Sequence, residues 1–128
     1  LEAMASADPR NSFVRRSLGV MYAARGRDLL AAGDGPGARA SLEAAIAVAR
    51  GLRSVDPGNA EHRRDLGFAL LHLAHVRAAA GEPGAALAGY REAAAHQEAL
   101  LAADPASAGD RGDLAASVGG AATALAAR

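Results

Sequence analysis

Residues 54–67 read SVDPGNAEHRRDLG, and closely similar stretches occur at two other places in the chain. SADPRNSFVRRSLG occupies residues 6–19, and AADPASAGDRGDLA occupies residues 102–115. The aspartates of the three Asp-Pro pairs stand at positions 8, 56 and 104, which gives a constant period of 48. Self-similarity at a fixed period of this length is typical of solenoids built from stacked helical units.

Each copy of this stretch carries signals that end one helix and begin the next. A residue that precedes proline is driven out of the α region, so Asp56 and Asp104 should each end a helix. Asn59 and Ser107 follow, and their side chains can accept the first free backbone N–H groups of a new helix. Asn11 holds the same place in the first unit.

A second kind of turn lies midway between these junctions. AAGDGPG at residues 31–37 and AAGEPG at residues 79–84 each combine a glycine with a following proline. Gly33 and Gly81 can take the left-handed conformation that closes a helix, and Pro36 and Pro83 suit the first turn of the next one. We therefore predict five helices, at about residues 11–32, 36–54, 59–80, 83–103 and 107–127.

Apolar residues recur at helical spacing on each predicted helix, which predicts its buried face. Because the linkers are short, neighbouring helices should run antiparallel. We expect an all-α fold of stacked helix-turn-helix units, with residues 1–128 as one domain and units at about 8–55, 56–103 and, in part, 104–128. The expected buried faces carry Val14, Leu18, Tyr22 and Leu29; Ala38, Leu42, Ala45, Ile46, Ala49 and Leu52; Leu66, Leu70, Leu73 and Ala80; Ala86, Tyr90, Ala93, Ala94, Leu100 and Leu101; and Leu114, Val118 and Leu125.

The composition excludes several classes of function. The 128 residues have a formal net charge of +0, which argues against a nucleic-acid binder, and they include no cysteine for disulfide or thiolate chemistry. No apolar run is long enough to span a bilayer, so we expect a cytoplasmic protein. All 14 basic residues are arginine, which suggests a GC-rich bacterial genome. The opening LEAMASADP resembles the end of a helix, which suggests a fragment of a longer protein.

One stretch resembles a known repeat family. LAHVRAAAGEPGAALAGYREAAAHQ at residues 73–97 resembles a tetratricopeptide repeat (TPR), with Leu73-Ala74, Gly81 and the series Ala86, Tyr90 and Ala93 at the family's positions. The first unit departs from the pattern at Arg25, where the family has leucine. The period of 48 is longer than the family's usual 34. DPASAGDRGDLAAS at residues 104–117 resembles a long bacterial variant often found downstream of serine/threonine kinase domains.

The resemblance implies a right-handed α-solenoid whose first helices line a concave groove that binds a peptide or partner segment. Exposed apolar residues in such a groove are themselves a mark of an interaction site. The leading hypothesis is therefore a non-catalytic protein–protein interaction scaffold. The alternative is a self-assembly or intramolecular docking module of a multidomain kinase-type protein, with a homodimer through the terminal helix as one form. The groove positions are Val20, Ala23, Arg27 and Leu30; Phe68, Leu71, His75 and Ala78; and Ala116, Gly119 and Thr123.

Few residues suggest chemistry of their own. His72 and His75 lie one turn apart, but a catalytic zinc needs a third ligand, so we interpret them as groove or surface residues. We interpret His62 and His96 as exposed. No serine has a recognisable base partner and no glycine-rich stretch fits a phosphate loop, so we expect neither an enzyme nor a cofactor.

Two recurring features have both a functional and a structural interpretation. The pairs Arg15-Arg16 and Arg63-Arg64 could bind an anion or an acidic peptide. Because they recur with the repeat, we favour a structural role in which Arg63 pairs with Glu61, Asp56 or the end of the preceding helix. Tyr90 could stack on a ligand, but its position in the family pattern favours core packing.

Overall fold

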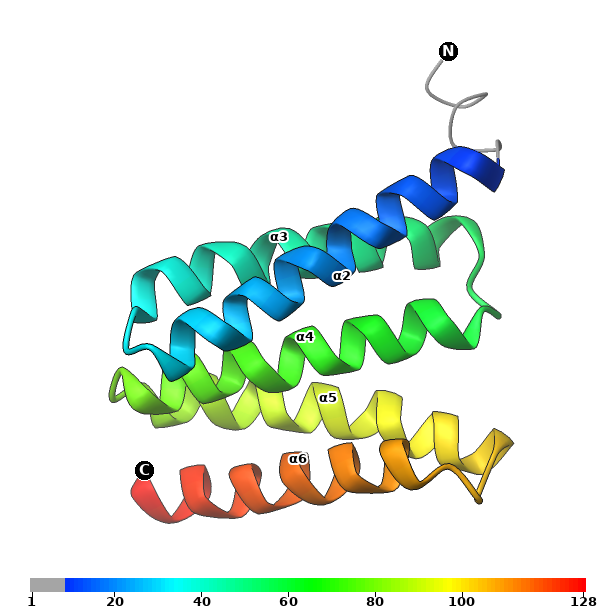
Figure 1. Cartoon of the computed structure of the whole chain (residues 1–128). Helices are drawn as coiled ribbons and strands as arrows, with labels where there is room; N and C mark the ends of the chain where they lie inside the picture. The colour runs from blue at the N-terminus through cyan, green and yellow to red at the C-terminus, as the bar shows by residue number, and fades with distance from the viewer. Residues whose placement is uncertain (1–8) are drawn as a thin grey trace.

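The structure is a computed structural model that describes residues 9–128, and five α-helices account for most of them (Figure 1). The all-α fold of antiparallel helices joined by short turns is confirmed. The interpretation of LEAMASADP as a helix end lies outside the described residues. The helices are α2 (Pro9–Ala31), α3 (Gly35–Val55), α4 (Ala60–Ala79), α5 (Pro83–Ala103) and α6 (Ala108–Ala127).

The turn chemistry explains where these helices begin and end. Asn59 Oδ1 accepts the backbone N–H of Glu61 at 2.9 Å, and Ser107 Oγ accepts that of Asp110 at 3.3 Å. Gly33 and Gly81 close α2 and α4 with φ of 86° and 77°, a conformation that other residues rarely adopt. These caps are confirmed. The helix start predicted at about residue 11 agrees with α2, but the capping role predicted for Asn11 is wrong, because Asn11 lies within the helix.

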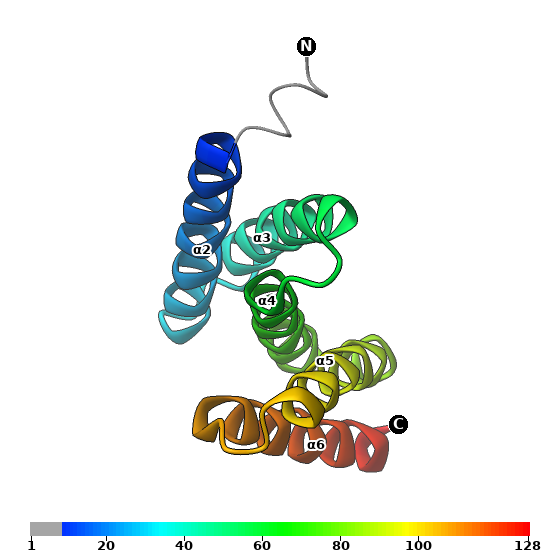
Figure 2. The same ribbon diagram turned by 90° about the vertical axis from the view of Figure 1, so that its right-hand side faces the viewer.

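Consecutive helices pack against each other in a zigzag. In Figure 2, α3 and α4 are seen nearly end-on, α2 and α6 lie at the two ends of the stack, and each helix lies against the next one in the chain. Ala38 and Ala86 are fully buried at the helix crossings, as the repeat pattern predicts. α4 is covered on both sides: Leu73 and Val76 pack with residues of α3, while Leu66 and Leu70 pack in a cluster with α5.

Several burial predictions are wrong, and each error has a packing reason. Val14 and Leu18 lie near the start of α2, which diverges from α4, and both are exposed. Ala80 caps the end of α4 and is exposed too. His62, predicted to be exposed, is buried near the start of α4, and the side chain of His96 on α5 is only 12% exposed.

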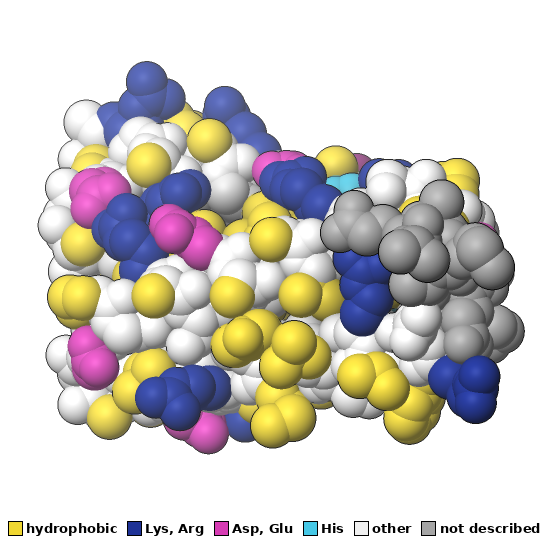
Figure 3. Space-filling view, turned by 90° about the horizontal axis from the view of Figure 1, so that it is seen from above, with side chains coloured by type: hydrophobic (Ala, Val, Ile, Leu, Met, Phe, Trp, Pro, Cys, Tyr) yellow, Lys and Arg dark blue, Asp and Glu magenta, His cyan; other side chains and the backbone are white. Residues whose placement is uncertain are grey.

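The two end helices expose apolar side chains that their counterparts in α4 bury. Val118 of α6 is 53% exposed, whereas Leu70, at the same place in the preceding unit, is 5% exposed beneath α5. The predicted burial of Val118 and Leu125 is therefore wrong: within residues 9–128, no helix packs on that side of α6. Figure 3 looks onto the opposite end, where hydrophobic side chains gather on the surface. Phe13 and Met21 of α2 are among the exposed large apolar residues.

Candidate functional site

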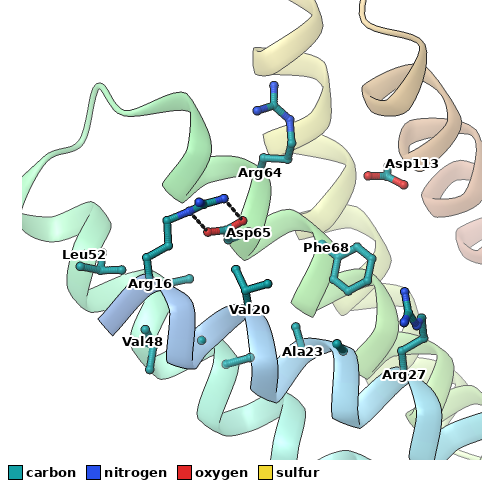
Figure 4. A pocket seen from close by; sticks show the side chains of 14 residues that line it. Arg16, Val20, Ala23, Arg27, Val48, Leu52, Arg64, Asp65, Phe68 and Asp113 are labelled. Carbon is teal, nitrogen blue, oxygen red and sulfur yellow. Dashed lines mark hydrogen bonds and ion pairs between the residues drawn. The ribbon is translucent and has the colours of Figure 1, made fainter. Parts of the chain in front are cut away.

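A cleft lies between α2 and α4, and α3 forms its floor (Figure 4). It exists because α2 stays close to α3 but diverges from α4 towards its N-terminus, as Figure 1 shows. An added Cβ at Gly19 would lie 2.8 Å from Val48 Cγ1, so a glycine allows α2 to approach α3 this closely. The cleft has a volume of about 290 Å³, at the lower end of the size of ligand pockets.

The floor and walls of the cleft are mainly apolar. Four residues of α3 form the floor, three of α2 form one wall, and the ring of Phe68 on α4 forms the other. Phe68 is only partly buried and also packs against a core cluster that includes Ala23. This surface can receive an apolar side chain. The floor is Ala45, Val48, Ala49 and Leu52, and the α2 wall is Val20, Ala23 and Ala24.

An ion pair bridges the two walls at one end of the cleft. Arg16 on α2 donates to both carboxylate oxygens of Asp65 on α4, at 2.8 and 3.3 Å, and lies 3.4 Å from Glu61. The hydrogen bond to Asp65 is the main reason that the pKa of Arg16 is raised. This pair ties the first unit to the second, so Arg16 has a structural partner although it lines the cleft.

The next arginine in the repeat makes a more deeply buried pair. Arg64 on α4 donates to both oxygens of Asp110 on α6, at 2.8 and 2.9 Å, and Asp110 is 1% exposed. The hydrogen bond from Arg64 lowers the pKa of Asp110 against the opposing effect of burial. The structural interpretation of the arginine pairs therefore holds for Arg16 and Arg64. The partners predicted for Arg63 are wrong, since no such ion pair forms among the described residues.

Asp113 on α6 is a different kind of carboxylate. It lines the cleft from the side opposite Val20 and is half-buried. Its side chain has no hydrogen-bond or ion-pair partner among residues 9–128. Burial raises the pKa of Asp113, and the nearby charge of Asp110 raises it further, while attraction from Arg64 lowers it only in part.

The corresponding space between α4 and α6 is filled by polar side chains. His96 and Gln97 stand one repeat after Val48 and Ala49 of the cleft floor. Gln97 is 2% exposed, and its amide lies 2.6 Å from Ser117 Oγ. With the amide nitrogen on that side, Gln97 also donates to the carbonyl oxygens of Ala93 and Asp113 at 3.2 Å. The repeat thus gives an open apolar cleft at one junction and a closed polar contact at the next.

A row of aromatic rings continues from the cleft along α4. The ring centroids of Phe68 and His72 are 4.3 Å apart, those of His72 and His75 are 5.6 Å apart, and those of His75 and Tyr90 are 5.3 Å apart. His75 Nδ1 lies 2.6 Å from the hydroxyl of Tyr90, which is otherwise buried in the core. The core position predicted for Tyr90 is confirmed.

Burial keeps these histidines neutral at pH 7. It lowers the pKa of His72 to about 4, with a smaller contribution from the charges of His75 and Arg27. It also lowers the pKa of His75. Within residues 9–128, no group of three histidines or carboxylates is arranged to hold a metal ion. The two rings therefore act as partly buried surface that extends the apolar wall of Phe68.

The structure brings together only some of the predicted groove residues. Val20, Ala23, Arg27 and Phe68 line the cleft. The groove assignment of Leu71 is wrong, because this side chain is 3% exposed and packs in the core cluster with Leu87 and Tyr90.

The other predicted positions lie away from the cleft. Leu30 packs against the cluster that contains Leu42, His75 belongs to the aromatic row, and Thr123 Oγ1 donates to the backbone carbonyl of Gly119 at 3.0 Å. Ala78, Ala116 and Gly119 are exposed and do not line the cleft.

Sequence reasoning misses two kinds of lining residue. The periodicity of α3 assigns Ala45, Ala49 and Leu52 to the core, where they are indeed buried, but it does not show that they also line a cleft together with Val48. Asp65 and Asp113 line the cleft but are absent from the predicted site. They stand one repeat of 48 residues apart, so an alignment of the units could have identified them as a recurring pair.

No protein-family model, curated protein or solved structure matches the chain. A search for membrane spans over the described residues finds no helix of the length and hydrophobicity that crossing a bilayer requires.

Proposed function

We propose that this chain is a non-catalytic, cytoplasmic, TPR-like scaffold that binds a peptide or partner segment in the cleft between α2 and α4. The observation that carries the proposal is the cleft itself, in which an apolar floor lies between two helices and charged side chains surround it. Sites of this kind, with an apolar interior and a few polar groups at the edge, suit a side chain of a partner protein.

The polar groups at the cleft favour binding over catalysis. Arg16 and Arg64 are engaged with carboxylates that hold the units together. Outside the cleft, at the next junction, the buried hydroxyl of Ser117 bonds to the amide of Gln97, which cannot act as a base for it. These groups therefore serve the geometry of the stack, and the apolar surface is the main part of the cleft that a ligand would contact.

A pair of neighbouring substitutions on α2 tests this proposal. Val20 lines the cleft, whereas Met21 is 68% exposed and does not line it. A random-peptide phage library is selected on the immobilised chain, and synthetic copies of the enriched peptides are titrated against Val20→Asp and Met21→Asp. We expect Val20→Asp to weaken binding at least about tenfold, because a carboxylate in an apolar contact must lose its hydration, and Met21→Asp to leave it unchanged.

Both variants place a charge on an exposed part of α2, so both should keep the melting temperature within a few degrees of the parent chain. Failure to enrich any peptide, or equal loss of binding in both variants, would overturn the proposal.

The exposed apolar faces at the two ends of the stack favour one second candidate, self-assembly or docking on another domain. Leu125 on α6 is 53% exposed, as is Val118 on the same helix. If the chain dimerises through this face, light scattering should show a dimer that Leu125→Asp converts to a monomer. A parent chain that stays monomeric up to high concentration would exclude dimerisation, and docking on another domain would then be the remaining form of this candidate.

A further inference from the structure

We propose that the cleft selects a partner segment that carries an arginine or lysine beside an apolar residue, with the basic side chain paired to Asp113. The inference rests on the proposed function and adds the chemistry of the ligand. The apolar side chain would lie on the α3 floor between Val20 and Phe68, and the basic one would reach α6.

The repeat shows what Asp113 lacks. Asp65 stands one repeat earlier, and it receives two hydrogen bonds from Arg16 of the preceding unit. The equivalent partner of Asp113 is Arg64, but Arg64 is already bound to Asp110 by two hydrogen bonds.

Asp110 binds Arg64 in place of Asp113, and the second unit has no carboxylate at the position equivalent to Asp110. The residue one repeat before Asp110 is His62, so the third unit brings two carboxylates, Asp110 and Asp113, to one arginine. Asp110 is the more deeply buried of the two and accepts from Nε and Nη2 of Arg64, which leaves Asp113 with only a longer-range attraction to Arg64.

A half-buried carboxylate without a partner is costly, because it has lost part of its hydration and gained no hydrogen bond in return. The raised pKa of Asp113 has this same cause. A guanidinium or ammonium group supplied by a ligand would restore the missing partner. Such a charge-assisted hydrogen bond is stronger than one between neutral groups.

The remaining charges at the cleft point to the same ligand. Arg16 and Arg64 are paired, so neither is available to an acidic ligand without the loss of a bond between units. Arg27 lies 3.4 Å from Asp28, its neighbour in the chain, and both side chains are largely exposed, so this pair is weak. Arg27 is therefore the one lining cation that an acidic ligand could reach, and the experiment includes this outcome.

The arrangement in Figure 4 sets the order of contacts. The ring of Phe68 lies between Val20 and Asp113 in this view, and all three residues line the same cleft. A peptide with its apolar side chain at Val20 would pass over Phe68 to reach Asp113. An arginine or lysine that crosses the ring face gains a cation–π contact in addition to the ion pair.

The test is a double-mutant cycle between the chain and a selected peptide. Peptides enriched on the full chain are synthesised with their basic residue intact or replaced by glutamine. Each is titrated against the parent chain, Asp113→Asn and the control Glu98→Gln, which removes an exposed carboxylate that does not line the cleft. We expect each change at the ion pair to weaken binding about tenfold, and the two together to weaken it no more than either alone.

Asp113→Asn should not unfold the chain, because it removes an unpaired, half-buried charge, and its melting temperature checks this. Enriched peptides without a basic residue, or additive effects in the cycle, would overturn the inference. Acidic peptides whose binding depends on Arg27 would overturn it as well.

Failure of the inference differs visibly from failure of the proposed function. Binding that Val20→Asp abolishes but Asp113→Asn does not change would leave the scaffold in place and remove only the basic anchor. If the library yields no binding peptide, both proposals fall together.

Discussion

Tyr90 shows how a single side chain joins three helices of the stack. It lies on α5, where it packs with Leu70 and Ala74 of α4, and its hydroxyl bonds to His75. Its ring also occupies the place where a Cβ of Gly120 would lie, so α6 can approach α5 only because residue 120 is glycine. The neighbouring Gly119 faces open space. The glycine pair thus contains one residue that packing requires and one that it does not.

The two glycines should therefore respond in opposite directions to the same substitution. Gly120→Ala should lower the free energy of unfolding by roughly 1–3 kcal/mol, because the new methyl group overpacks against the Tyr90 ring. Gly119→Ala should raise it by up to about 1 kcal/mol, because alanine favours the helix and nothing obstructs its methyl group. Urea unfolding of the two variants measures both effects. Equal destabilisation by both would mean that α6 does not pack on Tyr90 as described.

At the scale of the element, α4 combines a fully buried face with a half-buried row of rings. Leu66, Leu70 and Leu73 contact the helices on either side, while Phe68, His72 and His75 line the surface that continues from the cleft. The position of Leu71 in the core rather than in this row shows that α4 is buried around more of its circumference than one amphipathic face allows.

The row makes the stability of the fold depend on pH. His72 titrates near pH 6.5 in the unfolded chain and near pH 4 in the folded one. Between these values the unfolded state binds a proton that the folded state does not, so stability should fall as the pH falls from about 6.5 to about 4. The lowered pKa values of His75 and His96 act in the same direction.

His72→Asn should reduce this pH dependence without abolishing it. The urea midpoint near pH 6 and near pH 7 gives the slope, above the range in which the carboxyl groups titrate. An unchanged slope in His72→Asn would show that His72 is as hydrated in the folded state as in the unfolded one.

At the scale of the whole molecule, the stack is closed in its middle and open at its ends. α4 has a helix on each side, whereas α2 and α6 each expose apolar residues such as Phe13 and Val118. In a linear stack each unit is stabilised mainly by its neighbours, so local stability should follow this order.

Amide hydrogen exchange should show this gradient along the chain. We expect the slowest exchange in α4, and faster exchange in the N-terminal turns of α2 and in α6 from Leu125 onward. On sequence grounds alone, the Gly119-Gly120 pair lowers helix propensity, which predicts that α6 loses protection from about Gly119. The contacts of Gly120, Ala121 and Ala124 with the core around Tyr90 place that limit further along the helix. Exchange in α4 as fast as in the first turns of α2 would contradict the proposed stacking.

The sequence by itself determined the helices and their turns. Asn59, Ser107, Gly33 and Gly81 all act where the pattern predicts, because caps and left-handed turns depend on backbone groups only a few residues away. The burial of Ala38, Ala86 and Tyr90 was also predictable, since it recurs with the repeat.

Only the tertiary structure decided which faces meet. The divergence of α2 from α4 opens the cleft and leaves Val48 partly exposed on its floor, and no local signal encodes the angle between two helices. Arg64 could pair with either Asp110 or Asp113 on sequence grounds, since both lie on the same helix. The choice of Asp110 depends on how α6 is positioned against α4, a relation that arises from the packing of both helices on α5.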